Sequence, residues 1–126
     1  MYRVFLVEDE ILERENQRES QIWKMGEFTL CGDAANGQEA WDRLQEMDVD
    51  ILISDIKMPF MDGISLTRLV RAHMPHIKII ILSGYSEFTY AQQALGMGVT
   101  DYIVKPIRSS DLLEALRKVA CQIDSE

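Results

Sequence analysis

The chain has 126 residues, of which 47% are hydrophobic, enough for one domain around a single core. Its formal net charge of −8 excludes direct binding to duplex DNA, which requires a basic surface. No run approaches the ~18 apolar residues of a membrane span, so we expect no membrane partner. The first ten residues place acids directly after a short apolar run, so we expect no signal peptide there. Cys31 and Cys121 match no metal-binding spacing. We therefore expect reduced cysteines and a cytoplasmic protein.

Five short apolar runs alternate along the chain with segments of helical length. The predicted strands cover residues 3–8, 27–34, 50–55, 78–83 and 100–105. The predicted helices cover residues 10–25, 37–47, 64–73, 87–97 and 109–122. Strands that alternate with helices build βαβ units. The pattern therefore predicts an α/β fold, with a doubly wound parallel sheet and helices on both of its faces.

Residues with special backbone or capping roles support the ends of three predicted helices. Gly96 and Gly98 are expected to end the fourth helix, since glycine accepts the backbone conformation that follows a helix. Ser109 or Ser110 is expected to cap the last helix, because a serine hydroxyl accepts a hydrogen bond from a free backbone N–H. Pro75 lies just beyond the third helix, where proline is typical of a helix stop.

Polar side chains follow the predicted strands at their carboxyl ends. Glu8 and Asp9 end the first strand, and Asp55 ends the third. Ser83 ends the fourth strand, and Lys105 ends the fifth. Ligands of open α/β sheets bind beyond this edge, so we expect these five side chains to lie close together.

The residue types at this edge are those of a phosphoryl-transfer site. Clustered carboxylates repel one another, so a cation is expected beside Glu8, Asp9 and Asp55. An all-oxygen ligand set favours Mg²⁺, which leaves positions for phosphate oxygens. Asp55 can act as a nucleophile and become an aspartyl phosphate. Lys105 and Ser83 can then bind phosphoryl oxygens.

Each of these residues also has an ordinary structural interpretation. Glu8 and Asp9 suit the first turn of a helix, where acids interact favourably with the helix dipole. Ser83 is a common turn residue, and Lys105 can be a solvated surface cation. For any single residue the ordinary interpretation is at least as good. The functional interpretation is favoured for the set, because all its members fall on one edge.

Four stretches resemble the receiver domain of bacterial two-component response regulators: "VFLVEDE", "ILISDIKMPFMDG", "IIILSGY" and "VTDYIVKPI". Their order and spacing extend the resemblance from residue 2 to about residue 120. It implies a flavodoxin-like (βα)5 fold with a five-stranded parallel sheet in the order 2-1-3-4-5. It also implies that Asp55 accepts a phosphoryl group from a sensor histidine kinase. The Mg²⁺ ligands would come from Glu8, Asp9, Asp55 and the backbone carbonyl of Lys57.

The resemblance also implies a switch. Ser83 matches the Ser/Thr switch position of the family, and Tyr102 matches its switch aromatic. Phosphorylation would change the face formed by the fourth helix, fifth strand and fifth helix, and with it the affinity for partners, which include a second copy of the chain. From the residues alone, an ordinary half-buried strand aromatic is an equally good interpretation of Tyr102.

Three further expectations follow from the same resemblance. The peptide bond between Lys105 and Pro106 is expected to be cis. Lys57 and Tyr85 flank the site and are expected to tune the access of water to it. Such a domain is a signalling module that catalyses its own phosphotransfer and dephosphorylation, rather than an enzyme acting on other substrates.

The segment "GYSEFTYAQQAL" is similar to receivers that carry an AraC-type helix-turn-helix output domain. We therefore expect residues 1–126 to form a single receiver domain, with DNA bound only by an output domain outside this chain. The segment also has a plain interpretation, in which Phe88, Ala91 and Leu95 pack a helix. The two interpretations are compatible.

Two departures from the family pattern are notable. Glu8 stands where many relatives have Asp, and its longer side chain can alter the metal geometry. The first predicted helix has apolar residues only near its ends, at Leu12, Ile22 and Trp23. Two explanations are open, a polar surface for a partner or poor packing of the helix on the sheet.

Other functions fit the sequence less well. A degenerate receiver that works without phosphorylation conflicts with the complete set at the strand ends. A phosphatase of the haloacid-dehalogenase type needs Asp-x-Asp after its first strand, whereas Asp55 ends the third strand and Lys57 replaces the second acid. A nucleotide-binding enzyme is disfavoured because the chain has no G-x-G-x-x-G or P-loop sequence.

Overall fold

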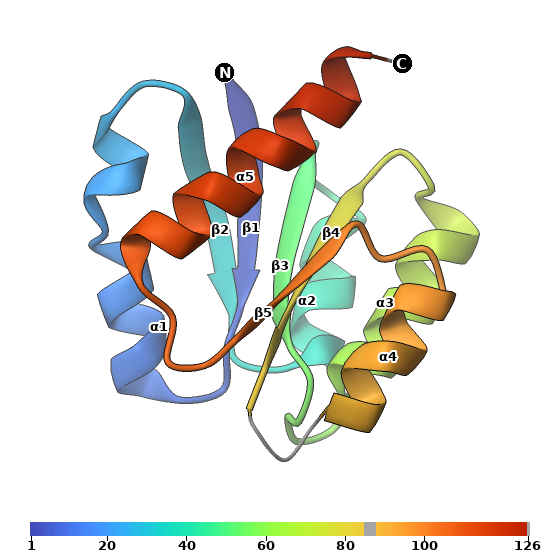
Figure 1. Cartoon of the computed structure of the whole chain (residues 1–126). Helices are drawn as coiled ribbons and strands as arrows, with labels where there is room; N and C mark the ends of the chain where they lie inside the picture. The colour runs from blue at the N-terminus through green and yellow to red at the C-terminus, as the bar shows by residue number, and fades with distance from the viewer. Residues whose placement is uncertain (85–87, 126) are drawn as a thin grey trace.

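Five parallel strands form one sheet in the order β2-β1-β3-β4-β5 (Figure 1). The computed structural model describes residues 1–84 and 88–125. The strands are β1 (Tyr2–Val7), β2 (Phe28–Ala34), β3 (Ile51–Asp55), β4 (Lys78–Ser83) and β5 (Asp101–Val104). The helices are α1 (Ile11–Arg18), the 3-10 helix η1 (Gln21–Lys24), α2 (Gly37–Leu44), α3 (Gly63–His73), α4 (Phe88–Gly96) and α5 (Ser109–Asp124). This is the predicted flavodoxin-like order.

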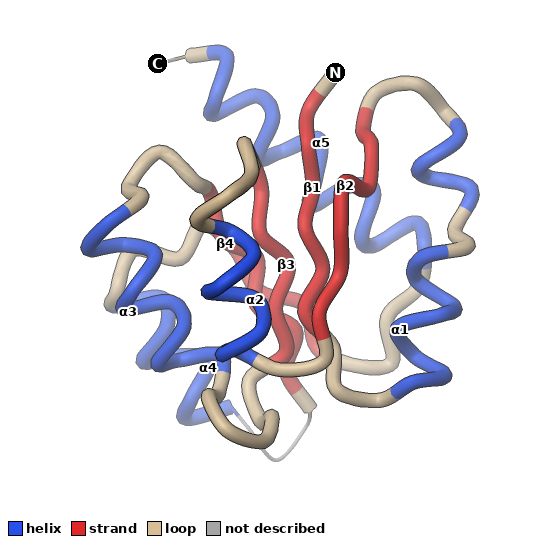
Figure 2. Tube along the Cα trace, turned by 180° about the vertical axis from the view of Figure 1, so that it is seen from behind, coloured by secondary structure: helices blue, strands red, loops and turns tan. Residues whose placement is uncertain are grey.

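Helices cover both faces of the sheet. Figure 2 shows α2, α3 and α4 together on one face, and Figure 1 shows α5 and α1 on the other. Buried aliphatic side chains fill the space on each side. Leu52 and Ile79 face α2, α3 and α4, whereas Ile53 and Ile80 face η1 and α5. Because adjacent residues of a strand point to opposite faces, the continuous apolar runs of β3 and β4 supply both cores.

The predicted first helix is two shorter elements. It was expected over residues 10–25, but α1 ends at Arg18 and η1 starts at Gln21. Ser20 separates them, since its hydroxyl accepts a hydrogen bond from the backbone N–H of Ile22 at 3.3 Å and so caps η1. No residue of α1 is buried, whereas Ile22 of η1 is 2% exposed. The apolar contact with the sheet therefore comes from η1, which explains why α1 has no apolar stripe.

Two of the other helices begin at capping side chains. Asn36 caps α2 by accepting from the N–H of Glu39, and Asp62 caps α3 by accepting from the N–H of Ser65, both at 2.8 Å. The predicted serine cap of α5 is wrong. That helix starts at Ser109 itself, and Arg108 at the N-cap position makes no side-chain capping bond.

The carboxyl end of α4 agrees with the sequence. The helix ends at Gly96, as predicted. Gly98 follows with φ of +89°, a conformation that glycine adopts without strain. Cys31 and Cys121 are not joined in a disulfide. Within the described residues, no helix is long and apolar enough to span a membrane.

Strand β2 forms one edge of the sheet. Its pairing with β1 shifts register between Val4 and Phe5, which face Leu30 and Gly32. A Cβ at Gly32 would lie 2.9 Å from the Phe5 ring. The Arg43 side chain reaches over this edge from α2. Its guanidinium lies 5.4 Å from the centroid of the Phe5 ring, and it donates a hydrogen bond to the carbonyl of Asp33.

Candidate functional site

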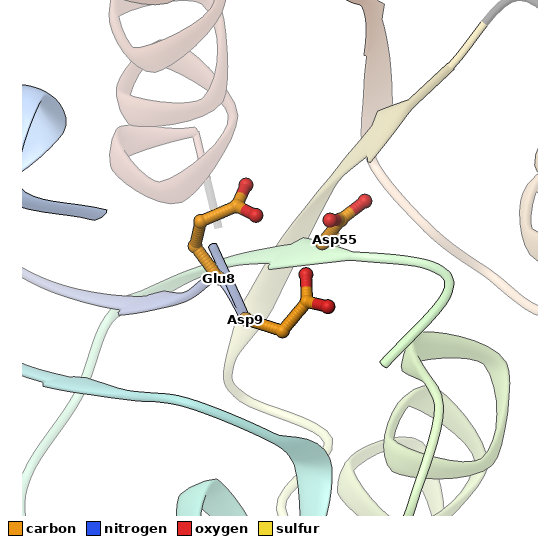
Figure 3. A group of neighbouring side chains, drawn as sticks. All are labelled: Glu8, Asp9 and Asp55. Carbon is orange, nitrogen blue, oxygen red and sulfur yellow. The ribbon is translucent and has the colours of Figure 1, made fainter. Parts of the chain in front are cut away.

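Three carboxylates meet beyond the carboxyl ends of two adjacent strands. Glu8 and Asp9 directly follow β1, and Asp55 is the last residue of β3. One oxygen of each carboxylate lies within 4.8 Å of the others, and Figure 3 shows the three groups around a common space. The sheet order places β1 beside β3, so the convergence predicted from the strand ends is present in the structure.

A lysine ammonium joins this cluster from the end of β5. The Nζ of Lys105 lies 2.9 Å from Oδ2 of Asp55 and 3.3 Å from Oε2 of Glu8. Glu8 is 1% exposed and Asp55 is 4% exposed, so both carboxyl groups are held away from water. The backbone N–H of Lys105 donates to the carbonyl of Ser83 at 2.8 Å, which fixes the start of the segment after β5 against β4.

Burial is the largest influence on the pKa of each charged group in the site. Burial, together with the charge of Asp55, raises the pKa of Glu8 to about 7, although Lys105 opposes the shift. Burial also raises the pKa of Asp55, against the hydrogen bond and charge of Lys105. Burial disfavours the charge of Lys105, but Asp55 and Glu8 outweigh it and raise the pKa of this lysine. One ammonium therefore does not fully compensate the carboxylates.

These residues fit a hard divalent cation. Glu8, Asp9 and Asp55 offer only oxygen ligands, at separations that one ion can bridge. Glu8 and Asp55 are both buried, and a bound cation would stabilise their carboxylate charges there. The set matches Mg²⁺, which combines few carboxylates with water and phosphate oxygens.

A close approach of α3 to β3 shapes the loop after Asp55. The N–H of Gly63 donates to the carbonyl of Ile56 at 2.7 Å, and the N–H of Ile56 donates to Oδ1 of Asp55 at 2.9 Å. A Cβ on Gly63 would lie 2.0 Å from the carbonyl oxygen of Asp55. Sequence analysis did not single out Gly63, although the Asp62-Gly63 turn was a usable signal.

The remaining predicted residues lie on neighbouring elements or outside the described part of the chain. Ser83 ends β4 and is 1% exposed, and Lys57 is exposed in the loop after β3. Tyr102 is half-buried and packs against the core on the side of α2, α3 and α4. The peptide bond between Lys105 and Pro106 is cis. Tyr85 lies outside the described residues.

Comparison with known proteins gives the family. Residues 4–117 match the family described as "Response regulator receiver domain". The chain belongs to this family. Receiver domains are the CheY-like phosphoacceptor modules of two-component signalling, and this one has the corresponding fold and acidic cluster.

Individual relatives agree with this assignment. The receiver domain is 33% identical over 123 residues to the transcriptional regulatory protein YesN of Bacillus subtilis, covering 98% of this chain but only 33% of YesN. It is 36% identical to the chemotaxis protein CheY of Thermotoga maritima, covering 94% of this chain and 97% of CheY. Among solved structures, the receiver domain of AraT from Geobacillus stearothermophilus superimposes with a TM-score of 0.91 at 35% identity, covering 98% and 96% of the two chains.

Proposed function

We propose that Asp55 is the phosphoacceptor of this receiver domain and that a sensor histidine kinase supplies the phosphoryl group in a Mg²⁺-dependent reaction. One observation carries the proposal: the ammonium of Lys105 lies 2.9 Å from a buried aspartate that shares a cluster with two further acids. In such a site the aspartate is desolvated, its position is fixed, and a cation is at hand for the incoming phosphoryl group.

The transfer is an in-line displacement at phosphorus. A carboxylate oxygen of Asp55 forms the new O–P bond, the N–P bond of the donor phosphohistidine breaks, and the electron pair returns to the imidazole nitrogen. Lys105 leaves the Asp55 carboxylate to bind a phosphoryl oxygen, and Ser83 binds another. Glu8, Asp9, Asp55 and the backbone carbonyl of Lys57 would hold Mg²⁺, which offsets charge on the phosphoryl oxygens. Lys57 and Tyr85 tune hydrolysis by controlling the access of water.

The kinase has a suitable place to dock beside the site. A groove of about 490 Å³ opens between α1 and the segment after β5, and Lys105 and Pro106 form part of its wall. The opposite wall is the polar side of α1, including Glu13 and Asn16. Lys105 lines this groove and also contacts Asp55, so a kinase docked in the groove would bring its phosphohistidine close to Asp55.

The output follows from a shift of the face formed by α4, β5 and α5. Ser83 would bond the phosphoryl group, Tyr102 would move into the vacated space, and the altered face would favour a homodimer. We further propose that residues 1–126 form a single receiver domain that acts on transcription through an AraC-type output domain. YesN is named as a transcriptional regulatory protein and this chain spans a third of it, which supports a transcriptional output; AraT is a response regulator. The AraC type of that output rests on the similarity of residues 84–95 to receivers with such a domain.

Phosphorylation by acetyl phosphate tests the chemistry directly. The intact mass is recorded with and without Mg²⁺, for the wild type and for Asp55→Asn. We expect one phosphoryl adduct that requires Mg²⁺ and is lost in the variant. A folded wild-type protein that forms no adduct, with acetyl phosphate or with its kinase, would favour a receiver that works without phosphorylation.

A further inference from the structure

Arg14 of α1 contacts the backbone of the acidic cluster. Its guanidinium donates from an Nη1 atom to the carbonyl oxygen of Glu8 at 2.9 Å. On its other side, its Nε lies 3.8 Å from Oδ1 of Asp33 on β2. The side chains of Arg14 and Asp33 are only 18% and 22% exposed. The guanidinium is therefore held between the edge strand and the first residue after β1.

The carbonyl of Glu8 needs such a donor. The N–H of Glu8 still pairs with the carbonyl of Ala34 at 3.1 Å, but β1 ends at Val7. Glu8 is buried, and a buried carbonyl without a donor costs about 1–3 kcal/mol. Arg14 supplies the hydrogen bond where the strand no longer does. It thereby fixes the peptide unit that connects Glu8 to Asp9.

The position of this peptide unit decides where two of the three carboxylates point. Glu8 and Asp9 are adjacent residues that must both turn toward Asp55, and the chain bends into α1 only two residues later. No residue of α1 is buried, so this helix does not hold the bend through apolar packing. Arg14 provides a charged link from the helix to both the site and the sheet edge.

We infer that Arg14 is a positioning residue for the cation site: held by Asp33, it fixes the Glu8–Asp9 backbone so that both acids face Asp55. The inference rests on the proposed function in that it assigns a divalent cation to the acidic cluster. Residues that orient metal ligands typically change metal affinity about 10- to 100-fold when they are replaced. Arg14 touches neither the cation nor the phosphoryl group in this scheme.

The chain provides a matched control in Arg18. This residue lies on the same helix, and its guanidinium is 3.5 Å from Oδ2 of the same Asp33. Arg18→Gln therefore removes the same charge and an ion pair to the same partner, but leaves the bond from Arg14 to Glu8 in place. A difference between the two glutamine variants isolates that bond from the general loss of positive charge.

The deciding measurement is the Mg²⁺ dissociation constant, determined by calorimetry without any phosphodonor. We expect Arg14→Gln to weaken Mg²⁺ binding about 10-fold. Arg14→Lys should lose less, because lysine keeps a hydrogen-bond donor at this position. Arg18→Gln should bind Mg²⁺ within about 2-fold of the wild-type affinity. Thermal unfolding of each variant shows that folded proteins are compared. If Arg14→Gln does not fold, Asp33→Asn is used, and its loss of Mg²⁺ affinity must exceed that of Arg18→Gln.

Two results would overturn the inference. One is equal Mg²⁺ affinity in Arg14→Gln and Arg18→Gln. If Arg14→Gln does not fold, the corresponding result is equal Mg²⁺ affinity in Asp33→Asn and Arg18→Gln. The other is a folded wild type that binds no Mg²⁺, which would also remove the cation from the proposed function. A wild type that binds Mg²⁺ with the expected dependence on Arg14 but forms no phosphoryl adduct would refute the proposed function alone.

Discussion

Gly63→Ala should damage the site and the fold together. The added Cβ would lie 2.0 Å from the carbonyl oxygen of Asp55, and real Cβ contacts are essentially never shorter than 3.0 Å. The α3 helix must therefore move at least 1.0 Å away from the end of β3, the difference between these two distances. The obstructing atom belongs to the backbone, so no side-chain rotation can relieve the contact.

The size of the effect follows from this displacement. Overpacking of this kind costs about 2–3 kcal/mol. In a chain of 126 residues each 1 kcal/mol corresponds to about 4 °C, so the melting temperature should fall by about 8–12 °C. A shift of about 1 Å beside a reacting group slows a reaction by up to about 100-fold. We therefore expect phosphorylation of the variant by acetyl phosphate to be about 10- to 100-fold slower.

Gly96→Ala is the matched control. Apart from the adjacent residues and the backbone of α4, no atom of the described part of the chain lies within 4 Å of a Cβ built at Gly96, which is exposed at the end of α4. Alanine is the better helix former, so this variant should keep or gain up to about 1 kcal/mol and phosphorylate normally. Calorimetry gives both melting temperatures, and intact mass against time gives both phosphorylation rates. A Gly63→Ala protein as stable and as reactive as the control would refute the reasoning.

Three further predictions concern stability. Ile22→Ala should lower the free energy of unfolding by about 2–4 kcal/mol in urea denaturation, because Ile22 is buried. Gln21→Leu should change it by less than about 0.5 kcal/mol, because Gln21 is exposed. Marked stabilisation by Gln21→Leu would instead indicate that this segment packs poorly on the sheet. Without metal, stability should fall as pH rises from about 4.5 to about 7, since folded Glu8 keeps its proton in that window and the unfolded residue releases it. Glu8→Gln should flatten this slope in denaturation with EDTA, and an unchanged slope would contradict the assignment. Phe60→Asn should raise the free energy of unfolding by up to about 1 kcal/mol, measured by thermal unfolding. Phe60 has φ of +68°, which asparagine tolerates better, and its side chain is 90% exposed. A lower free energy of unfolding would show that the ring contributes to the fold.

The strand and helix pattern could be predicted because it depends on local sequence. The apolar run of residues 78–83 coincides with β4, and the chain ends α4 at Gly96 as expected. The gathering of Glu8, Asp9 and Asp55 was also predictable, since parallel strands end at one edge. These features need only periodicity, turn residues and the general topology of βαβ units.

Features that depend on contacts between distant residues could not be predicted. The Arg14–Asp33 pair forms only after α1 and β2 are placed beside each other. The bond from Lys105 to Glu8 depends on how far a glutamate reaches at one particular strand end. The break after α1 was partly visible, because Ser20 is a good cap and the apolar stripe is missing. Helical spacing alone favoured one continuous helix.

The Arg43 side chain over β2 has a consequence for solubility. An edge strand offers free N–H and C=O groups to a strand of another molecule, which is a common start of aggregation. Here Arg43 already occupies the carbonyl of Asp33 and lies over the Phe5 ring. The register shift at Cys31, which β1 leaves unpaired, breaks the regular spacing of the strand. A second chain would have to displace a charged side chain and match an irregular ladder. This edge is thereby protected against intermolecular sheet growth.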